Sequence, residues 1–217
     1  MFRPVAWILT IVLASCANLS TYQTARVLPP KTTRFMLGYG YAMSPVVTAP
    51  VDPTERDKAA YIQRYYEFAA RGGTKPNIDL GLKYTFPAQL LGDIKQQFLD
   101  WHGLAMAIGL GIGGFSTTSR EEVNSGVNQF KLMVPFYLSY DLGWFLGIYT
   151  AAKYHFEYYF GTLNGISNMV SATAGVRIGN KWGLLVEGSY GQNLRYSHIQ
   201  PHQISAALFF GNAPSVK

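Results

Sequence analysis

Two groups of side chains in this sequence have the residue types and spacing that acid–base chemistry needs. His155 and Glu157 stand two residues apart, so that in an extended strand they share one face. Ser197 and His198 are adjacent and lie close in sequence to His202. A base and the carboxylate that orients it are two of the three parts of a nucleophilic site. The sequence matches no nucleophile to them, and we therefore expect no enzymatic activity.

Other kinds of site are even less well represented. The chain has four scattered histidines and one cysteine, without the close spacing of metal ligands. The run GLGIGG (109–114) differs from a phosphate-binding loop, because no helix follows it. The formal charge is +6, but the Lys and Arg residues form no run of the nucleic-acid-binding type. We expect no metal, no cofactor and no nucleic-acid partner.

The single cysteine has a specific context near the N-terminus. Arg3 is followed by an apolar run over residues 5–13, which is typical of a secretory signal peptide and too short to span a membrane as a mature helix. The letters LASC (13–16) resemble the lipobox of bacterial lipoproteins. This resemblance implies that a lipoprotein signal peptide over 1–15 is removed and that Cys16 is acylated, for example with palmitate. An ordinary signal peptide with a chance cysteine is the alternative.

From Arg34 onward, apolar and polar residues alternate with a period of two, which is typical of strands with two different faces. Between residues 130 and 140 the even positions are apolar or aromatic, whereas the odd positions include Lys131 and Ser139. Such segments lie near 34–43, 60–71, 77–87, 91–99, 103–115, 128–140, 144–158, 166–179, 182–192 and 202–210. We predict an all-β fold, an antiparallel up-and-down transmembrane β-barrel of about ten strands, with eight to twelve as the range.

The connections between these segments alternate in length, with the one at 87–91 as the exception. Those at 72–77, 100–103, 141–143 and 179–181 are short, and those at 44–59, 116–127, 159–165 and 193–201 are longer. Outer-membrane barrels have short periplasmic turns, longer external loops and an even number of strands. Both ends of the barrel should therefore lie in the periplasm. We divide the mature chain into a periplasmic tether (16–33), the outer-membrane barrel (34–211) and a C-terminal tail (212–217), with the lipid anchor on the periplasmic side.

The segment from Gly103 to Phe115 indicates which face of the wall points inward. Its even positions are large and apolar, whereas the odd positions from Gly103 to Gly113 are glycine or alanine. Small residues suit a crowded interior and make a poor surface for water. Charged residues are only 14% of the chain, and Trp and Tyr gather near the segment ends, as in the aromatic girdles of membrane barrels. A soluble lipocalin-like barrel, with the apolar faces inside around a ligand, is the competing architecture.

If the apolar faces meet lipid, the other faces bring charges of both signs into the lumen. The predicted luminal residues are Arg34, Glu67, Arg71, Asp79, Lys83, Asp93, Lys95, Lys131, Lys153, His155, Glu157, Arg177 and Glu187. Buried charges must be compensated, so one interpretation is that these groups pair and plug the barrel. The other is that they line a narrow water-filled path for small solutes.

The last predicted strand carries a further resemblance. QISAALFF (203–210) is similar to the terminal assembly signal of outer-membrane barrels, although Ser205 replaces the usual glycine and seven residues follow. With RGGTKPNIDLGLKY, LAMAIGLGIGGF and ATAGVRIGNKWGLLVEGSY, it resembles a family of small outer-membrane barrel lipoproteins of two-membrane bacteria. This resemblance implies fold and location, outer-membrane lipids as surroundings, and the barrel-assembly machinery as a partner during insertion.

The sequence thus favours a structural or narrow-channel role in the bacterial outer membrane. Two alternatives stay open. Outer-membrane barrels also include lipid-modifying and proteolytic enzymes, so the architecture permits catalysis. A lipocalin-like lipoprotein would instead bind a ligand inside a soluble barrel.

Overall fold

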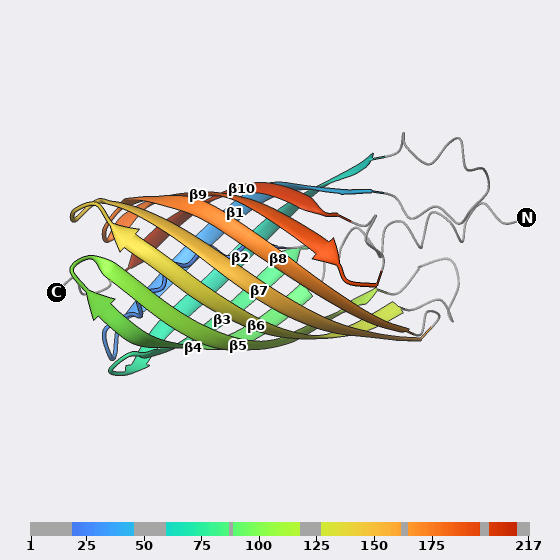
Figure 1. Cartoon of the computed structure of the whole chain (residues 1–217), viewed down its shortest axis with the longest axis horizontal. Coiled ribbons are helices and arrows are strands. Elements are labelled where there is room, and N and C mark those ends of the chain that lie inside the picture. The colour runs from blue at the N-terminus through green and yellow to red at the C-terminus, as the bar shows by residue number, and fades with distance from the viewer. Residues whose placement is uncertain are drawn as a thin grey trace, which may run out of the picture.

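The computed structural model describes residues 19–45, 60–86, 89–117, 127–161, 165–195 and 200–211. Cys16, the signal peptide and the C-terminal tail, as well as Ser197 and His198, lie outside these residues. Ten strands make up the fold (Figure 1). They are β1 (Thr33–Pro45), β2 (Ala60–Lys75), β3 (Ile78–Phe86), β4 (Gln89–Trp101), β5 (Leu104–Thr117), β6 (Val127–Asp141), β7 (Leu146–Gly161), β8 (Gly165–Gly179), β9 (Trp182–Asn193) and β10 (His202–Gly211).

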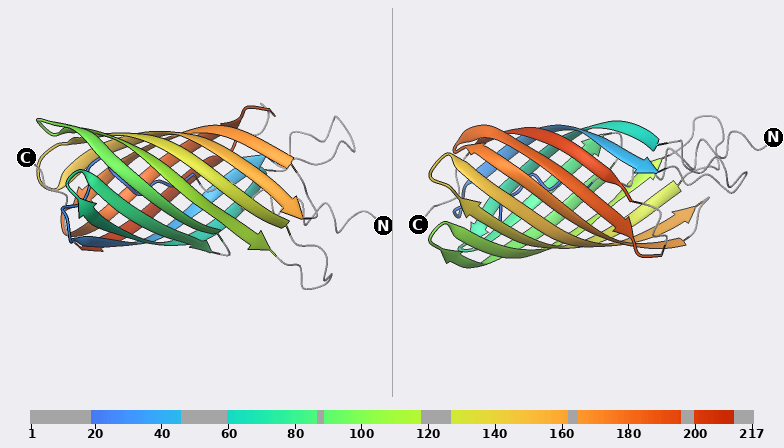
Figure 2. Two further views of the ribbon diagram at one scale, coloured as in Figure 1. Left: turned by 90° about the horizontal axis from the view of Figure 1, so that it is seen from below. Right: turned by 45° about the horizontal axis from the view of Figure 1, so that its top comes forward.

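The strands form one closed, all-antiparallel barrel. Each strand pairs with its neighbours in sequence, and β1 pairs with β10 from Arg34 opposite Gly211 to Met43 opposite His202. Figure 2 shows the strands tilted around a continuous wall, so that no sheet edge is left open. The predicted fold is confirmed, with ten strands close to the ten predicted segments. Within the described ranges, no helix is long and apolar enough to cross a membrane.

The barrel has two different ends, which we call the turn end and the loop end. At the turn end, on the left of Figure 1, short connections join β2 to β3, β4 to β5, β6 to β7 and β8 to β9. The β8–β9 turn requires a glycine, since Gly179 has a φ of +106° and a Cβ there would lie 2.2 Å from the Trp182 carbonyl oxygen. The other five connections between strands are at the loop end.

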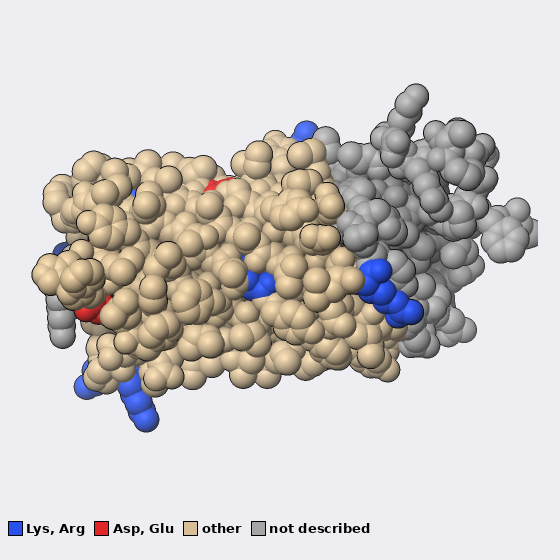
Figure 3. All heavy atoms as spheres, in the orientation of Figure 1, with Lys and Arg blue, Asp and Glu red and all other residues tan. Residues whose placement is uncertain are grey.

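The outer wall is apolar along its length. On β5, Ile108, Leu110 and Ile112 are 43–52% exposed, whereas Ala105 and Ala107 on the other face are fully buried. Figure 3 shows few charged atoms on the side of the described barrel, most of them near its ends. A lipocalin-like barrel needs the opposite arrangement, because its outer wall must be soluble in water. The outer wall therefore contradicts that alternative and suits lipid.

Aromatic side chains ring the outer wall at both ends. Trp101, Trp144 and Trp182 are the most exposed of them and lie in or beside the short turns. At the loop end, Tyr84 and Tyr158 are also exposed. Amphipathic rings at these two levels suit the interfaces between lipid and water. The girdle prediction fails at Tyr159, whose hydroxyl donates to Glu157 in the lumen.

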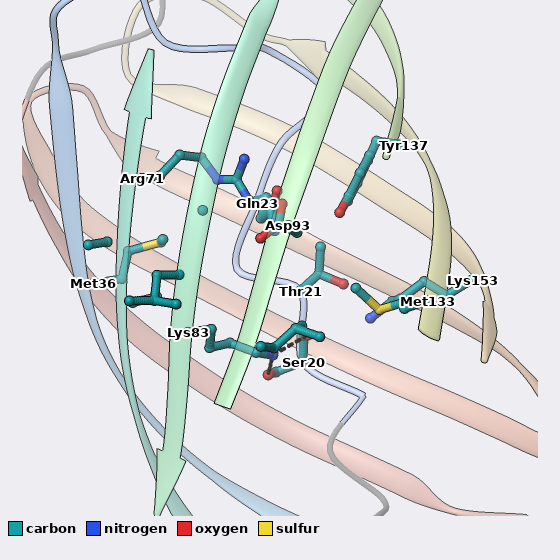
Figure 4. A pocket seen from close by; sticks show the side chains of 15 residues that line it. Ser20, Thr21, Gln23, Met36, Arg71, Lys83, Asp93, Met133, Tyr137 and Lys153 are labelled. Carbon is teal, nitrogen blue, oxygen red and sulfur yellow. Dashed lines mark hydrogen bonds and ion pairs between the residues drawn. The ribbon is translucent and has the colours of Figure 1, made fainter. Parts of the chain in front are cut away.

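The chain before β1 differs most from the sequence analysis. Residues 19–32, which we call the luminal segment, were expected to belong to a tether outside the fold. In the structure they run inside the barrel, and nearly every residue from Leu19 to Leu28 is buried. Figure 4 shows this segment passing between the walls, with Ser20, Thr21 and Gln23 inside. The interior of the barrel is thus filled partly by the chain itself.

The small residues of β5 make room for this segment. Ala25 of the luminal segment packs with Ala105, Ala107, Ala151 and Tyr137 in one buried cluster. Larger side chains on β5 would compete with the luminal segment for this volume, because protein interiors are close-packed. The run of glycine and alanine is therefore on the inner face, as expected. Its alanines pack against Ala25 of the luminal segment, whereas a Cβ on Gly109 or Gly111 would meet side chains of β6.

Candidate functional site

The charged lumen is the candidate functional site, and neighbouring strands position its residues. All thirteen predicted luminal residues lie on the inner face; twelve are buried and Lys83 is half-buried. Strict alternation explains this placement, because every second residue of a barrel strand points inward. The structure thus brings these residues into one interior, where they form several distinct groups.

One group is centred on Arg71 of β2. Its guanidinium forms ion pairs with Asp79 of β3 and Asp93 of β4. The Lys95 Nζ atom lies 3.4 Å from the second Asp79 oxygen. Gly81 leaves space for this group, since a Cβ there would lie 2.3 Å from the Arg71 Nη2 atom. Two cations and two carboxylates therefore compensate one another away from water.

A second group contains residues that the sequence analysis did not select. Arg26 of the luminal segment forms ion pairs with Asp100 of β4 and Asp141 of β6, and its Nη1 atom lies 2.7 Å from Asp100. Arg177 of β8 approaches the other Asp141 oxygen at 3.0 Å. Asp100 and Asp141 stand at strand ends next to predicted turns, where acidic residues are ordinary. Only the position of Arg26 inside the barrel reveals them as luminal partners.

Arg34 lies at the turn end, where it donates to the Asn180 carbonyl at 3.2 Å, and the remaining charges lie closer to the loop end. Lys83 Nζ lies 3.1 Å from a Glu67 carboxylate oxygen, and Lys131 Nζ lies 3.2 Å from Glu157. Glu187 of β9 accepts hydrogen bonds from the amides of Thr21 (2.6 Å) and Tyr22 (2.9 Å) and from the Tyr149 hydroxyl (2.9 Å). The Lys153 ammonium donates to the Leu19 carbonyl. These charges are therefore satisfied partly by each other and partly by backbone.

Backbone contacts are what distinguish this lumen from a simple set of ion pairs. The Lys95 ammonium donates to the carbonyls of Thr24 and Arg26, at 2.9 Å each. Amide groups of the luminal segment donate to side-chain oxygens of Gln203, Ser139, Gln97 and Asp79. An extended segment has no regular partners of its own, and buried backbone groups must be paired. The polar inner face of the barrel supplies those partners.

A small cavity lies beside the luminal segment. It is lined by residues that include Ser20, Thr21, Arg71, Lys83 and Lys153 (Figure 4). Its volume of about 20 Å³ is close to the space that one water molecule requires. This cavity is too small to serve as a path for solutes.

The candidate catalytic residues are arranged differently from the expected pair. His155 and Glu157 share the inner face, but the His155 Nε2 atom is hydrogen-bonded to the Ser171 hydroxyl of β8, at 2.8 Å. Among the described residues, the buried His155 Nδ1 atom has no hydrogen-bond partner. The orienting carboxylate that a nucleophilic triad needs is therefore not in place. His202 is on the outer side near the Tyr190 ring, away from this pair.

No group of three or more His, Cys, Asp or Glu side chains in the described part of the chain could hold a metal ion. The lumen pairs its carboxylates with cations or amides instead, which leaves little free ligand charge for a cation.

No protein-family model matches the chain, and no curated protein matches it. Among solved structures, it is similar to an outer membrane channel from Pseudomonas putida F1, with 7% identity and a TM-score of 0.47 over 88% of this chain and 99% of that one. It is similar to the translocator domain of the autotransporter NalP from Neisseria meningitidis, with 12% identity and a TM-score of 0.44. That match covers 96% of this chain and 95% of the other. It is also similar to the outer membrane protease OmpT from Escherichia coli, with 10% identity and a TM-score of 0.39. That match covers 87% of this chain and 98% of the other.

Proposed function

We propose that this chain is a lipoprotein of the bacterial outer membrane with a structural role, whose barrel is closed by its own luminal segment. The observation that carries the proposal is the binding of residues 19–28 by luminal side chains. Glu187, Lys95 and Lys153 each bind backbone atoms of that segment. Such contacts hold the peptide in place, and the cavity beside it has a volume of only about 20 Å³.

The outer wall supports the location. It is apolar, edgeless and bounded by aromatic rings, and a closed barrel satisfies every backbone group of its wall within the bilayer. Outer-membrane lipids are then the natural surroundings of residues such as Ile108 and Leu110. The terminal QISAALFF motif supports insertion by the barrel-assembly machinery, and the LASC motif supports acylation of Cys16.

A narrow channel is the second role we consider, and it requires the luminal segment to move. Removing residues 19–28 would expose the inner faces of all the strands that bind them, including Glu187 and Lys95. A polar lumen of this kind would fill with water. The two roles therefore differ in whether the segment stays bound in the native membrane.

Planar-bilayer recording distinguishes these roles. We expect the full-length protein to show no steady conductance. A variant that lacks residues 19–28 should open, because it loses both the backbone and the side-chain contacts that hold the segment in the lumen. Ile112→Ala, on the outer wall, is the matched control and should stay closed. Steady conductance of the unaltered protein would contradict a closed barrel, and heat-modifiable gel migration checks that each variant has folded.

A further inference from the structure

The luminal segment has a direction, and this direction determines where the chain before it must go. At the turn end, the Lys31 amide donates to the Gly73 carbonyl at 2.9 Å. At the other end of the segment, the Leu19 amide donates to the Gln203 side chain at 2.6 Å. Gln203 is the second residue of β10, which begins at the loop end. The segment therefore runs from the loop half of the barrel down to the turn end.

The surroundings of Leu19 support this position. A Cβ on Gly191 would lie 3.1 Å from a Leu19 methyl carbon and 3.1 Å from Pro201, a residue of the connection between β9 and β10. Gly191 stands two residues before the end of β9, again at the loop end. Leu19 is therefore within reach of the loop face.

The reach of a peptide limits the position of Cys16. Cys16 precedes Leu19 by three residues, which span at most about 11 Å when fully extended. From Leu19 to Lys31 the segment itself needs twelve residues to arrive at the turn end. Three residues are far too few to return over that distance. Cys16 therefore cannot reach the membrane leaflet at the turn end while residues 19–32 occupy the lumen.

The described wall of the barrel offers the chain no lateral exit toward the turn end. Every strand is hydrogen-bonded to both neighbours, so the wall has no lateral opening. The cavity beside the segment is about 20 Å³, which is too small for a second peptide strand. The remaining way out is the loop end.

We propose that the barrel holds residues 19–32 as a chain threaded across the membrane, so that the N-terminal side of Leu19 leaves at the loop face. With long loops outside, as in outer-membrane barrels, this is the cell surface. The consequence for the lipid rests on the proposed acylation of Cys16. Its acyl chains would then enter the outer leaflet beside the loops, and not the periplasmic leaflet that the sequence suggests. The barrel would then enclose the chain and hold its lipidated N-terminus at the cell surface.

The binding pattern in the lumen suits a fixed, threaded chain. Glu187 binds two successive amides, those of Thr21 and Tyr22, and Lys95 binds two carbonyls, those of Thr24 and Arg26. Paired backbone contacts of this kind fix the register of a peptide along the barrel axis. The Arg26 ion pairs with Asp100 and Asp141 fix the segment further, near the turn end.

Epitope accessibility on intact cells tests the route of the chain. A short epitope inserted between residues 17 and 18 of the full-length protein is compared with the same epitope between residues 122 and 123, in a loop-end connection, and after residue 217, beyond β10 at the turn end. We expect antibody to label the first two on intact cells, and the third only after the outer membrane is permeabilised. Heat-modifiable migration verifies that each tagged barrel has folded.

Labelling of the N-terminal epitope only after permeabilisation, together with the C-terminal one, would overturn the threaded route. Metabolic labelling with an alkyne analogue of palmitate, measured on the same tagged proteins, tests acylation separately. Surface exposure of the epitope without palmitate labelling would remove the lipid and leave the route standing. Palmitate labelling with an epitope on the turn side would remove the route and leave the lipoprotein proposal standing.

Discussion

At the scale of single residues, the lumen is organised by compensation of charge. Arg71 illustrates the point, because it contacts two carboxylates, Asp79 and Asp93, from two further strands. A buried ion pair adds little net stability compared with an apolar pair of the same shape, but removal of one partner leaves an uncompensated charge. Single luminal substitutions should therefore cost more stability than their number of contacts suggests.

Substitution of Arg71 by methionine should destabilise the barrel by about 3–5 kcal/mol, since Asp79 and Asp93 would lose their shared cation. Urea unfolding in detergent micelles measures the change. Lys181→Met is the matched control, because Lys181 is an exposed cation in the β8–β9 turn, and it should change stability by less than about 0.5 kcal/mol. Equal effects of the two substitutions would show that the ion pairs of Arg71 do not contribute to the stability of the barrel.

The contact between His155 and Ser171 leads to a second prediction at this scale. The two side chains are hydrogen-bonded at 2.8 Å, but both are buried and the Nδ1 atom of His155 has no hydrogen-bond partner among the described residues. A serine activated for nucleophilic attack needs an oriented base and access to a substrate. We expect a fluorophosphonate probe to leave Ser171 unlabelled in the folded protein. Labelling that is lost in Ser171→Ala would instead favour a hydrolytic enzyme.

At the scale of elements, the luminal segment and the strands are fitted to each other. Gly38 of β1 shows this fit, because a Cβ there would lie 2.6 Å from the ring of Tyr22. Gly73 of β2 is similar, since a Cβ would meet the Pro29 carbonyl oxygen at 2.1 Å. Glycine at these two positions lets the segment lie directly against the wall. The wall and the segment therefore form one packed unit.

Gly38→Ala should loosen the luminal segment, because the added methyl group displaces the Tyr22 ring. We expect a loss of about 1–3 kcal/mol in stability, typical of overpacking, and current fluctuations in planar bilayers. Gly188→Ala adds the same methyl group to the exposed outer face of β9, where nothing lies within 4 Å, so it should change neither property. An unchanged Gly38→Ala protein would mean that Tyr22 does not rest against β1 in the membrane.

At the scale of the whole molecule, two features are independent of each other. The barrel closes through pairing of β1 with β10 and does not need Cys16. The proposed anchor depends on Cys16 and on the signal that precedes it. Location in the membrane should therefore survive loss of the lipid, because the apolar outer wall is itself insoluble in water.

Cys16→Ala separates the two features. We expect the variant to lose labelling by the palmitate analogue while it stays in the membrane fraction and keeps heat-modifiable gel migration. Cell fractionation, metabolic labelling and gel migration before and after boiling provide the measurements. Release of the variant as a soluble periplasmic protein would contradict the barrel as the main membrane attachment, whereas retained label would exclude Cys16 as the acylated residue.

Much of this architecture could be predicted from the sequence by itself. A strand with lipid on one side and a crowded lumen on the other must alternate, so the period of two located ten strands and their inner faces. The thirteen luminal residues followed from the same rule, since the wall alone determines which side chains point inward. The small residues of β5 were also placed correctly, although the sequence did not show what they accommodate.

Only the tertiary structure decided where residues 19–32 lie and how the luminal charges are paired. The segment shows no alternation of apolar and polar residues that would reveal its position. Its backbone is bound instead by side chains such as Glu187, Lys95 and Gln203, from strands far apart in sequence. Arg26 was missed for the same reason, as its partners become neighbours only when the barrel closes. Alternation records which face a residue occupies; it does not record which residues meet across a closed interior.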